Sequence, residues 1–490
     1  MSIMKKKFSN YLIIVFLIQI FAVFSLAQNL QIRLKLNPGN SSDFMISGKF
    51  SPEVSEKNLL FLLSYADSEN LGSRISNVQL FDDYGQIISH KKIAEGTFAA
   101  EKPFSSFSYR INAAIPPNIL SVAHISWISG QKGILRTNDL LPTFAVKYKT
   151  NLWLELPPNW KTSTTEESVE QNKFFIRNIE NAVFIVGRGW SRKTFQVSGV
   201  NVNLILDDQW NIEKTFVEKI TKEILLKYEN YFGAIPNKNL SVINFRFPKD
   251  VCFERWRAEA TGSNIIIMSA PTTFESQIRQ RMQEQLRHEI FHLWMPNNLA
   301  LKGDYGWFYE GFAQYTALKT GIALNQISFR DFLNTLEQAY NLGNRRSQPI
   351  SLIQASKNRW LSENSSVYSK GLAVAFLFDI ALIKQSGGRR DLISLLNQIY
   401  EKHKNPNKPE DANTAIIKFF ENYKELSPII NDYVLGPEKL NFEKYLTQTG
   451  IEISTPGTDI KFRVKDDLSG REKDFLNKLG YNNWRKTLSK

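Results

Sequence analysis

Cysteine is nearly absent from this chain of 490 residues, which contains only Cys252. A single thiol cannot form a disulfide within the chain, so the fold must be stabilised by the packing of apolar side chains. Dense charge of one sign is also missing. No run of five or more like charges occurs, although Lys and Arg outnumber Asp and Glu by 61 to 48. The net charge of +13 is therefore scattered, and without a nucleic-acid-binding motif the sequence predicts no nucleic-acid partner.

The first 27 residues have the layout of a secretory signal peptide. The basic stretch MSIMKKKFSN precedes the apolar run YLIIVFLIQIFAVFSLA, and the small residues Ser25 and Ala27 stand before polar Gln28. We predict that residues 1–27 are removed after Ala27 and that the mature chain is exported, either to the periplasm or out of the cell. The alternative is an uncleaved anchor, because the apolar run is close to the length that spans a bilayer. Only in that case would the protein associate with a membrane.

The remainder of the chain predicts an α+β protein. Residues 28–205 show short alternating runs such as LQIRLKL and VNVNLIL between turn residues, which favours a β-sandwich-like domain. Residues 206–450 have long helical periods and predict a mainly helical second domain. Within it the apolar segment 373–383 is too short to span a membrane and contains Asp379, so it predicts a buried core helix. Residues 451–490, rich in Lys, Asp, Gly and Asn, predict a weakly structured tail.

The segment RHEIFHLW places two of the chain's five histidines, His288 and His292, four residues apart with Glu289 beside the first. On a helix, residues at this spacing lie one above the other, so both rings can bind one metal ion while the glutamate reaches a water on that ion. No other Cys or His is near enough in sequence to close the site with a fourth ligand, which disfavours a purely structural zinc site.

Helix signals surround this pair. Thr272 and Glu275 form a plausible capping box at its start, and Pro296 closes it. Apolar residues recur at helical spacing between them, at Ile278, Met282, Leu286, Ile290 and Leu293. At about 100° per residue, the histidine pair lies roughly 120° from the centre of this stripe. The packing face and the histidine face are therefore distinct.

Glu310 is the predicted third ligand. It lies among aromatic and apolar neighbours in WFYEGF, residues 307–312, where an unpaired carboxylate would be costly. A helix from about 307 to 320 returning antiparallel over the first would bring it to the histidines, because seventeen residues separate it from His292. We therefore expect one Zn²⁺ ion on His288, His292 and Glu310. The alternative for Glu310 is a buried glutamate bonded to backbone or to an arginine.

The pattern His288-Glu289-x-x-His292 followed by WFYEGFAQY resembles the gluzincin zinc metallopeptidases, in which the glutamate of the second segment completes the zinc site. Within this group the chain is most similar to the glycyl-aminopeptidase family of secreted bacterial enzymes. It is more distantly similar to the alanyl-aminopeptidase and leukotriene-hydrolase family. The resemblance implies a thermolysin-like catalytic domain and peptide substrates. Glu289 is expected to act as the general base on a zinc-activated water.

Two further residues follow from this resemblance. SSVYSKGLAVAFLFDI is similar to a Tyr-x-Lys-Gly helix that supplies a transition-state tyrosine, at the position of Tyr368. The segment RAEATGSN resembles the glycine-rich motif whose glutamate anchors a substrate's amino terminus. Glu259 stands at a plausible spacing from Gly262, but the glycines that precede the glutamate in that motif are missing. The expected function is an exported zinc peptidase, aminopeptidase-like. One alternative is an endopeptidase. The other is a peptidase-fold binding protein without turnover. The incomplete motif favours this binding protein, whereas the intact Glu289 argues against it.

Overall fold

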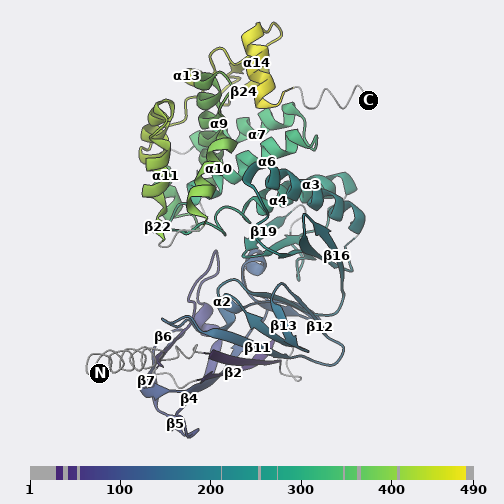
Figure 1. Ribbon diagram of the computed structural model, residues 1–490, viewed down its shortest axis with the longest axis vertical. Helices are drawn as coiled ribbons and strands as arrows, with labels where there is room; N and C mark the ends of the chain where they lie inside the picture. Colours follow the sequence, from purple (N-terminus) through teal and green to yellow (C-terminus); the bar gives the residue numbers. More distant parts are fainter. Residues whose placement is uncertain are drawn as a thin grey trace, which may run out of the picture.

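The computed structural model describes residues 29–36, 42–51, 56–210, 212–251, 255–272, 274–345, 348–360, 366–404 and 409–481. The predicted signal peptide lies outside these ranges. A β-rich part contains the amino-terminal strands, and a mainly helical part contains the carboxyl-terminal half (Figure 1). A five-stranded sheet lies between them.

The amino-terminal part is built from two facing sheets. Along β1 (Asn29–Leu36) alternate residues are buried, as the period-two pattern requires. One sheet has the order β13-β14-β11-β1-β2-β8-β4-β5, and the other has the order β12-β15-β10-β9. Leu34 of the first sheet and Val186 of the second belong to one buried cluster, so apolar side chains of the two sheets pack together.

The strands of these sheets have the following bounds: β2 Asp43–Ser51, β4 Ile75–Phe81, β5 Ile87–Ile88, β8 Ser106–Asn112, β9 Trp127–Ser129, β10 Lys132–Arg136, β11 Lys149–Glu155, β12 Lys161–Thr164, β13 Glu167–Glu170, β14 Lys173–Ile176 and β15 Val183–Gly187. A smaller sheet contains β3 (Glu56–Leu60), β7 (Thr97–Phe104) and β6 (His90–Ala94).

The five-stranded sheet joins the two parts of the chain. Its order is β16-β17-β18-β20-β19, with bounds Trp190–Val197, Val200–Asp207, Asn239–Arg246, Asn264–Ser269 and Trp256–Thr261. One face packs on β9, β10 and β15, and the other packs on α3 (Lys214–Phe232) and α4 (Glu275–Phe291). Because β17 pairs with β18, this sheet crosses the boundary that the sequence suggested at residue 205. The domain limits themselves stay a prediction.

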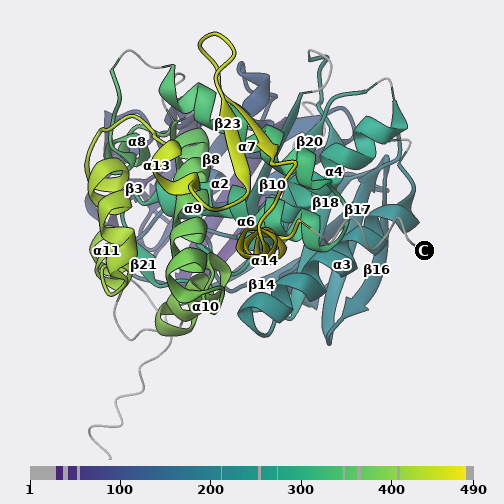
Figure 2. The same cartoon turned by 90° about the horizontal axis from the view of Figure 1, so that it is seen from above.

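The helical part surrounds α9 (Ser366–Ser386). Figure 2 shows α9 among α6 (Gly311–Ala323), α7 (Phe329–Asn344), α10 (Leu392–His403) and α13 (Glu443–Leu446). Among the described residues α9 alone is long and apolar enough to cross a membrane, but 89% of its most apolar window is buried inside the protein. Its Asp379 accepts hydrogen bonds from the Tyr315 hydroxyl and the Leu392 amide. The predicted core helix at 373–383 is therefore confirmed. The remaining elements here are α5 Gly306–Tyr309, α8 Leu352–Lys357, α11 Ala412–Phe420, α12 Ser427–Ile429, β21 Leu301–Lys302 and β22 Glu410–Asp411.

The predicted weak structure of the carboxyl-terminal segment is wrong for residues 451–481. They form the hairpin β23 (Ile451–Ser454) and β24 (Lys461–Val464), followed by α14 (Gly470–Leu479). A capping box between Ser469 and Glu472 starts α14, and Leu476 and Leu479 are fully buried. The high content of charged and turn residues concealed an apolar stripe at helical spacing.

The predicted helix starts and ends need two corrections near the histidines. α4 begins after Phe274, whose side chain cannot cap, so the capping box of Thr272 and Glu275 is wrong. α4 also ends at Phe291 rather than near Pro296. His292 follows in a right-handed helical conformation, with φ −65° and ψ −16°, so its ring still lies one turn from His288.

Candidate active site

The rings of His288 and His292 face one another at the end of α4. Their centroids are 4.7 Å apart, and their Nε2 atoms are 3.1 Å apart. The Nδ1 atom of His292 lies 2.9 Å from the carbonyl oxygen of Met295, so it carries the ring proton and donates it. The Nε2 atom of His292 then has a free lone pair that faces His288. This Nδ1-protonated tautomer is the one that a metal-binding imidazole requires.

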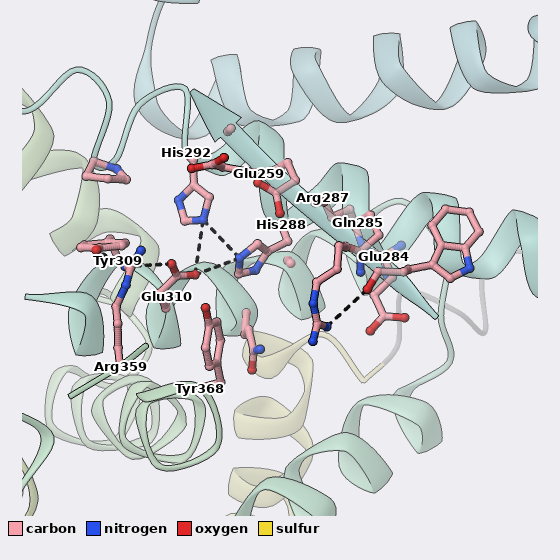
Figure 3. Close-up of a pocket in the computed structure, with 18 of the residues that line it drawn as sticks. Glu259, Glu284, Gln285, Arg287, His288, His292, Tyr309, Glu310, Arg359 and Tyr368 are labelled. Carbon is pink, nitrogen blue, oxygen red and sulfur yellow. Dashed lines mark hydrogen bonds and ion pairs between the residues drawn. The ribbon is translucent and has the colours of Figure 1, made fainter. Parts of the chain in front are cut away.

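Glu310 completes this cluster from the junction of α5 and α6. Its Oε2 lies 3.2 Å from His288 Nε2 and 3.6 Å from His292 Nε2 (Figure 3). Burial tends to raise the pKa of Glu310, but the neighbouring His288, His292 and Arg359 hold that pKa well below its usual value. The carboxylate is therefore ionised, and it meets the histidines as the sequence predicts.

Arg359 holds the other oxygen of Glu310. Its Nη1 lies 3.2 Å from Glu310 Oε1 and also donates to the hydroxyl of Tyr309, while the guanidinium stacks on Trp360 at 4.0 Å. The two environments predicted for Glu310 therefore occur together: its carboxylate contacts the histidines through Oε2 and an arginine through Oε1. Sequence reasoning missed Arg359, which lies in no recognisable motif and contacts Glu310 across 49 positions of sequence.

Close approach of two helices places Tyr368 next to Glu310. α6 and α9 cross at Gly311 and Gly371, and a Cβ added to Gly311 would lie 2.5 Å from the Cα of Gly371. Only glycine at this crossing allows the backbones to touch. Tyr368, three residues before Gly371, points toward Glu310 (Figure 3). Burial raises the pKa of Tyr368, and the nearby Glu310 raises it further, so its hydroxyl keeps its proton.

The donor atoms of His288, His292 and Glu310 lie within 4.8 Å of one another, and they are the one such group of three among the described residues. Two imidazoles and one carboxylate are a donor set that suits zinc in sites with an open position. The second oxygen of Glu310 and the Nδ1 of His292 are engaged by protein, which orients the remaining donors toward a common point. The residues therefore fit the predicted ion.

A cavity of about 840 Å³ opens beside this group. Glu289 and Tyr368 line it, together with Glu259 of β19. Glu289 is only 5% exposed, and burial raises its pKa, although the neighbouring histidines act in the other direction. A carboxylate with a raised pKa is suited both to accept and to return a proton.

Glu259 lies on the edge strand β19, and its carboxylate contacts three side chains of the amino-terminal part. Oε2 lies 2.6 Å from Arg136 Nη2 and 3.2 Å from His124 Nδ1, and Oε1 accepts a hydrogen bond from the Tyr65 hydroxyl. Burial acts to raise the pKa of Glu259, but Arg136, His124 and Tyr65 lower it to about 2. One ring nitrogen of His124 is therefore engaged by Glu259. Tyr65 and Arg136 were not anticipated.

No protein-family model matches the sequence, and no curated protein matches it in sequence. Solved structures do match its fold. An aminopeptidase N family protein from Idiomarina loihiensis is similar with a TM-score of 0.74 and 16% identity, over 87% of this chain and 79% of that protein. The M1 zinc metallopeptidase from Deinococcus radiodurans is similar with a TM-score of 0.55 and 13% identity, over 85% and 95%. A mutant of it has been solved with the substrate Tyr-Ser-Ala.

One of these neighbours is an aminopeptidase N family protein and the other is an M1 zinc metallopeptidase, and the chain has their fold. The similarity covers most of both proteins, including the amino-terminal β-rich part. It agrees with the gluzincin resemblance of the zinc-site motifs, and it does not distinguish the glycyl-aminopeptidase family from its relatives.

Proposed function

We propose that this chain is an exported, zinc-dependent peptidase of the aminopeptidase-like type. The observation that carries the proposal is the convergence of His288, His292 and Glu310 within 4.8 Å at the wall of a large cavity, with Glu289 beside them. Export rests on the signal-peptide pattern of residues 1–27 alone. The peptide complex of the Deinococcus relative supports a peptide as the substrate class.

Each side chain has a defined task in this proposal. A zinc ion held by His288, His292 and Glu310 would lower the pKa of a water to about 7 and polarise the scissile carbonyl. Glu289 takes a proton from the attacking water and returns it to the leaving amine. Its burial favours this exchange, because the raised pKa brings its proton affinity closer to that of the reacting groups.

Tyr368 is the proposed donor to the oxyanion of the tetrahedral intermediate. Its hydroxyl remains protonated, and the ring projects from α9 toward Glu310 on the cavity wall. A hydrogen-bond donor held in place before the reaction stabilises developing negative charge without reorganisation. The close contact of Gly311 and Gly371 holds α6 and α9 together at this crossing.

Hydrolysis of a peptide panel tests the proposal. The purified mature chain, loaded with one equivalent of Zn²⁺, is incubated with unblocked and amino-acetylated peptides, and the products are identified by mass spectrometry. We expect cleavage that stops on addition of a chelator and returns when zinc is restored. If no peptide of either kind is cleaved, the alternative of a peptidase-fold binding protein replaces the proposal.

A further inference from the structure

The carboxylate of Glu259 already has a cation. We propose that Arg136 supplies to Glu259 the positive charge that a substrate's α-ammonium would otherwise supply, so that this cavity discriminates only weakly between peptides with free and with blocked amino termini. The inference rests on the proposed peptidase function, and it names the substrate class of the same site.

The ion pair is fixed by burial. Arg136 is 1% exposed, its Nη2 lies 2.6 Å from Glu259 Oε2, and its Nη1 donates to Thr261 Oγ1 at 3.0 Å. Nη2 also donates to the carbonyl oxygen of Ala123. The Glu259 side chain is 14% exposed. Turning Glu259 toward a substrate ammonium would leave the charge of Arg136 buried without a carboxylate, which is strongly unfavourable.

Both oxygens of Glu259 are engaged as well. Oε1 accepts the hydroxyl hydrogen of Tyr65, while Oε2 is shared by Arg136 and His124. A carboxylate offers about four acceptor positions, and three are therefore occupied. The rings of Tyr65 and His124 pack against Trp360, with centroids 6.4 and 5.9 Å apart, so these partners cannot swing away easily.

A second acid of the same cavity wall is likewise occupied. The carboxylate of Asp67 accepts hydrogen bonds from Ser121 Oγ at 2.7 Å and from Asn118 Nδ2 at 3.0 Å, one on each oxygen. The Glu259 end of the cavity therefore presents an internally paired acid and an acid held by neutral donors. These two carboxylates are expected to bind an ammonium group more weakly than an unpaired, exposed carboxylate would.

The test compares two peptides that differ only in acetylation of the amino terminus. For the zinc-loaded wild type we expect their kcat/KM values to differ by less than about tenfold, which corresponds to 1.4 kcal/mol. A preference for the free amine of tenfold or more overturns the inference. If neither peptide is cleaved, the result counts against the proposed function and not against this inference. The Kd values of both peptides are then measured by calorimetry, and the same tenfold criterion is applied to them. Binding of neither peptide overturns the inference too.

Two variants distinguish a Glu259 that anchors the substrate's amino group from a Glu259 that is paired with Arg136. Glu259→Gln keeps the shape of the side chain, and we expect it to change the ratio of the two kcat/KM values by less than about threefold. A selective loss of tenfold or more on the free-amine peptide would show that Glu259 is the working anchor. Arg136→Met should release Glu259 and raise the preference for the free amine at least tenfold, and an unchanged ratio in the folded variant contradicts the inference. If Arg136→Met does not fold, the result for Glu259→Gln still tests the inference.

Discussion

Replacing Glu289 with Gln is expected to lower kcat by about a hundred- to ten-thousand-fold while leaving zinc content unchanged. The amide keeps the volume of the side chain in its buried position but cannot accept the proton of the attacking water. The three predicted ligands are untouched, so the ion should remain. The measurements are kcat on a cleaved peptide and zinc per chain by plasma mass spectrometry on the same preparation.

Glu275→Gln is the matched control for this variant. Glu275 lies at the start of the same helix, its side chain is 60% exposed, and it forms an ion pair with Arg279. Exposed pairs of this kind contribute little to stability, so we expect kcat within about twofold of wild type. If Glu289→Gln retains more than about a tenth of wild-type kcat, Glu289 is not the general base.

Replacing Tyr368 with Phe is expected to lower kcat by about a hundred- to a thousand-fold with little change in KM. The hydroxyl is proposed to bond to the oxyanion that exists only along the reaction path, so its loss should weaken binding of the transition state and not of the substrate. Steady-state kinetics on one peptide separate these two parameters.

Tyr305→Phe serves as the control for loss of a buried tyrosine hydroxyl. Tyr305 is 5% exposed and packs against Tyr309, with ring centroids 4.9 Å apart, but it does not line the cavity. Its kcat should stay near that of wild type. A Tyr368→Phe variant that raises KM while kcat is unchanged would assign the tyrosine to substrate binding instead.

Local sequence patterns were sufficient to predict the grouping of the three proposed zinc ligands, because their chemistry is carried by short spacings. His288 and His292 lie one helical turn apart, and Glu310 is conspicuous as an acid among aromatic and apolar neighbours. The structure places all three donors together, and the fold class agrees with that of the structural neighbours. Helix ends were less predictable, since Phe274 precedes α4 and provides no side-chain cap.

Contacts between distant segments could not be predicted in this way. Arg359 reaches Glu310, and Tyr65 and Arg136 reach Glu259, across intervals of 49 to 194 positions. No periodicity marks such pairs, because each partner is an ordinary residue of its own strand or loop. The carboxyl-terminal helix was missed for another reason: its apolar stripe is short and lies among many charges.

These long-range contacts give the amino-terminal part a role in the cavity. Tyr65, His124 and Arg136 belong to the β-rich part, and all three contact a carboxylate on the edge strand of the central sheet. Because β19 also borders the helix that carries the histidines, the two parts of the chain build one site. The cavity wall would be incomplete without the β-rich part.

The zinc content of the mature chain, measured after zinc loading and exhaustive dialysis, tests the central claim most directly. If His288, His292 and Glu310 share one ion, the protein retains about one zinc per chain, and His292→Ala loses it. A wild-type protein that retains no zinc, or a His292→Ala variant that retains as much as wild type, would contradict the account.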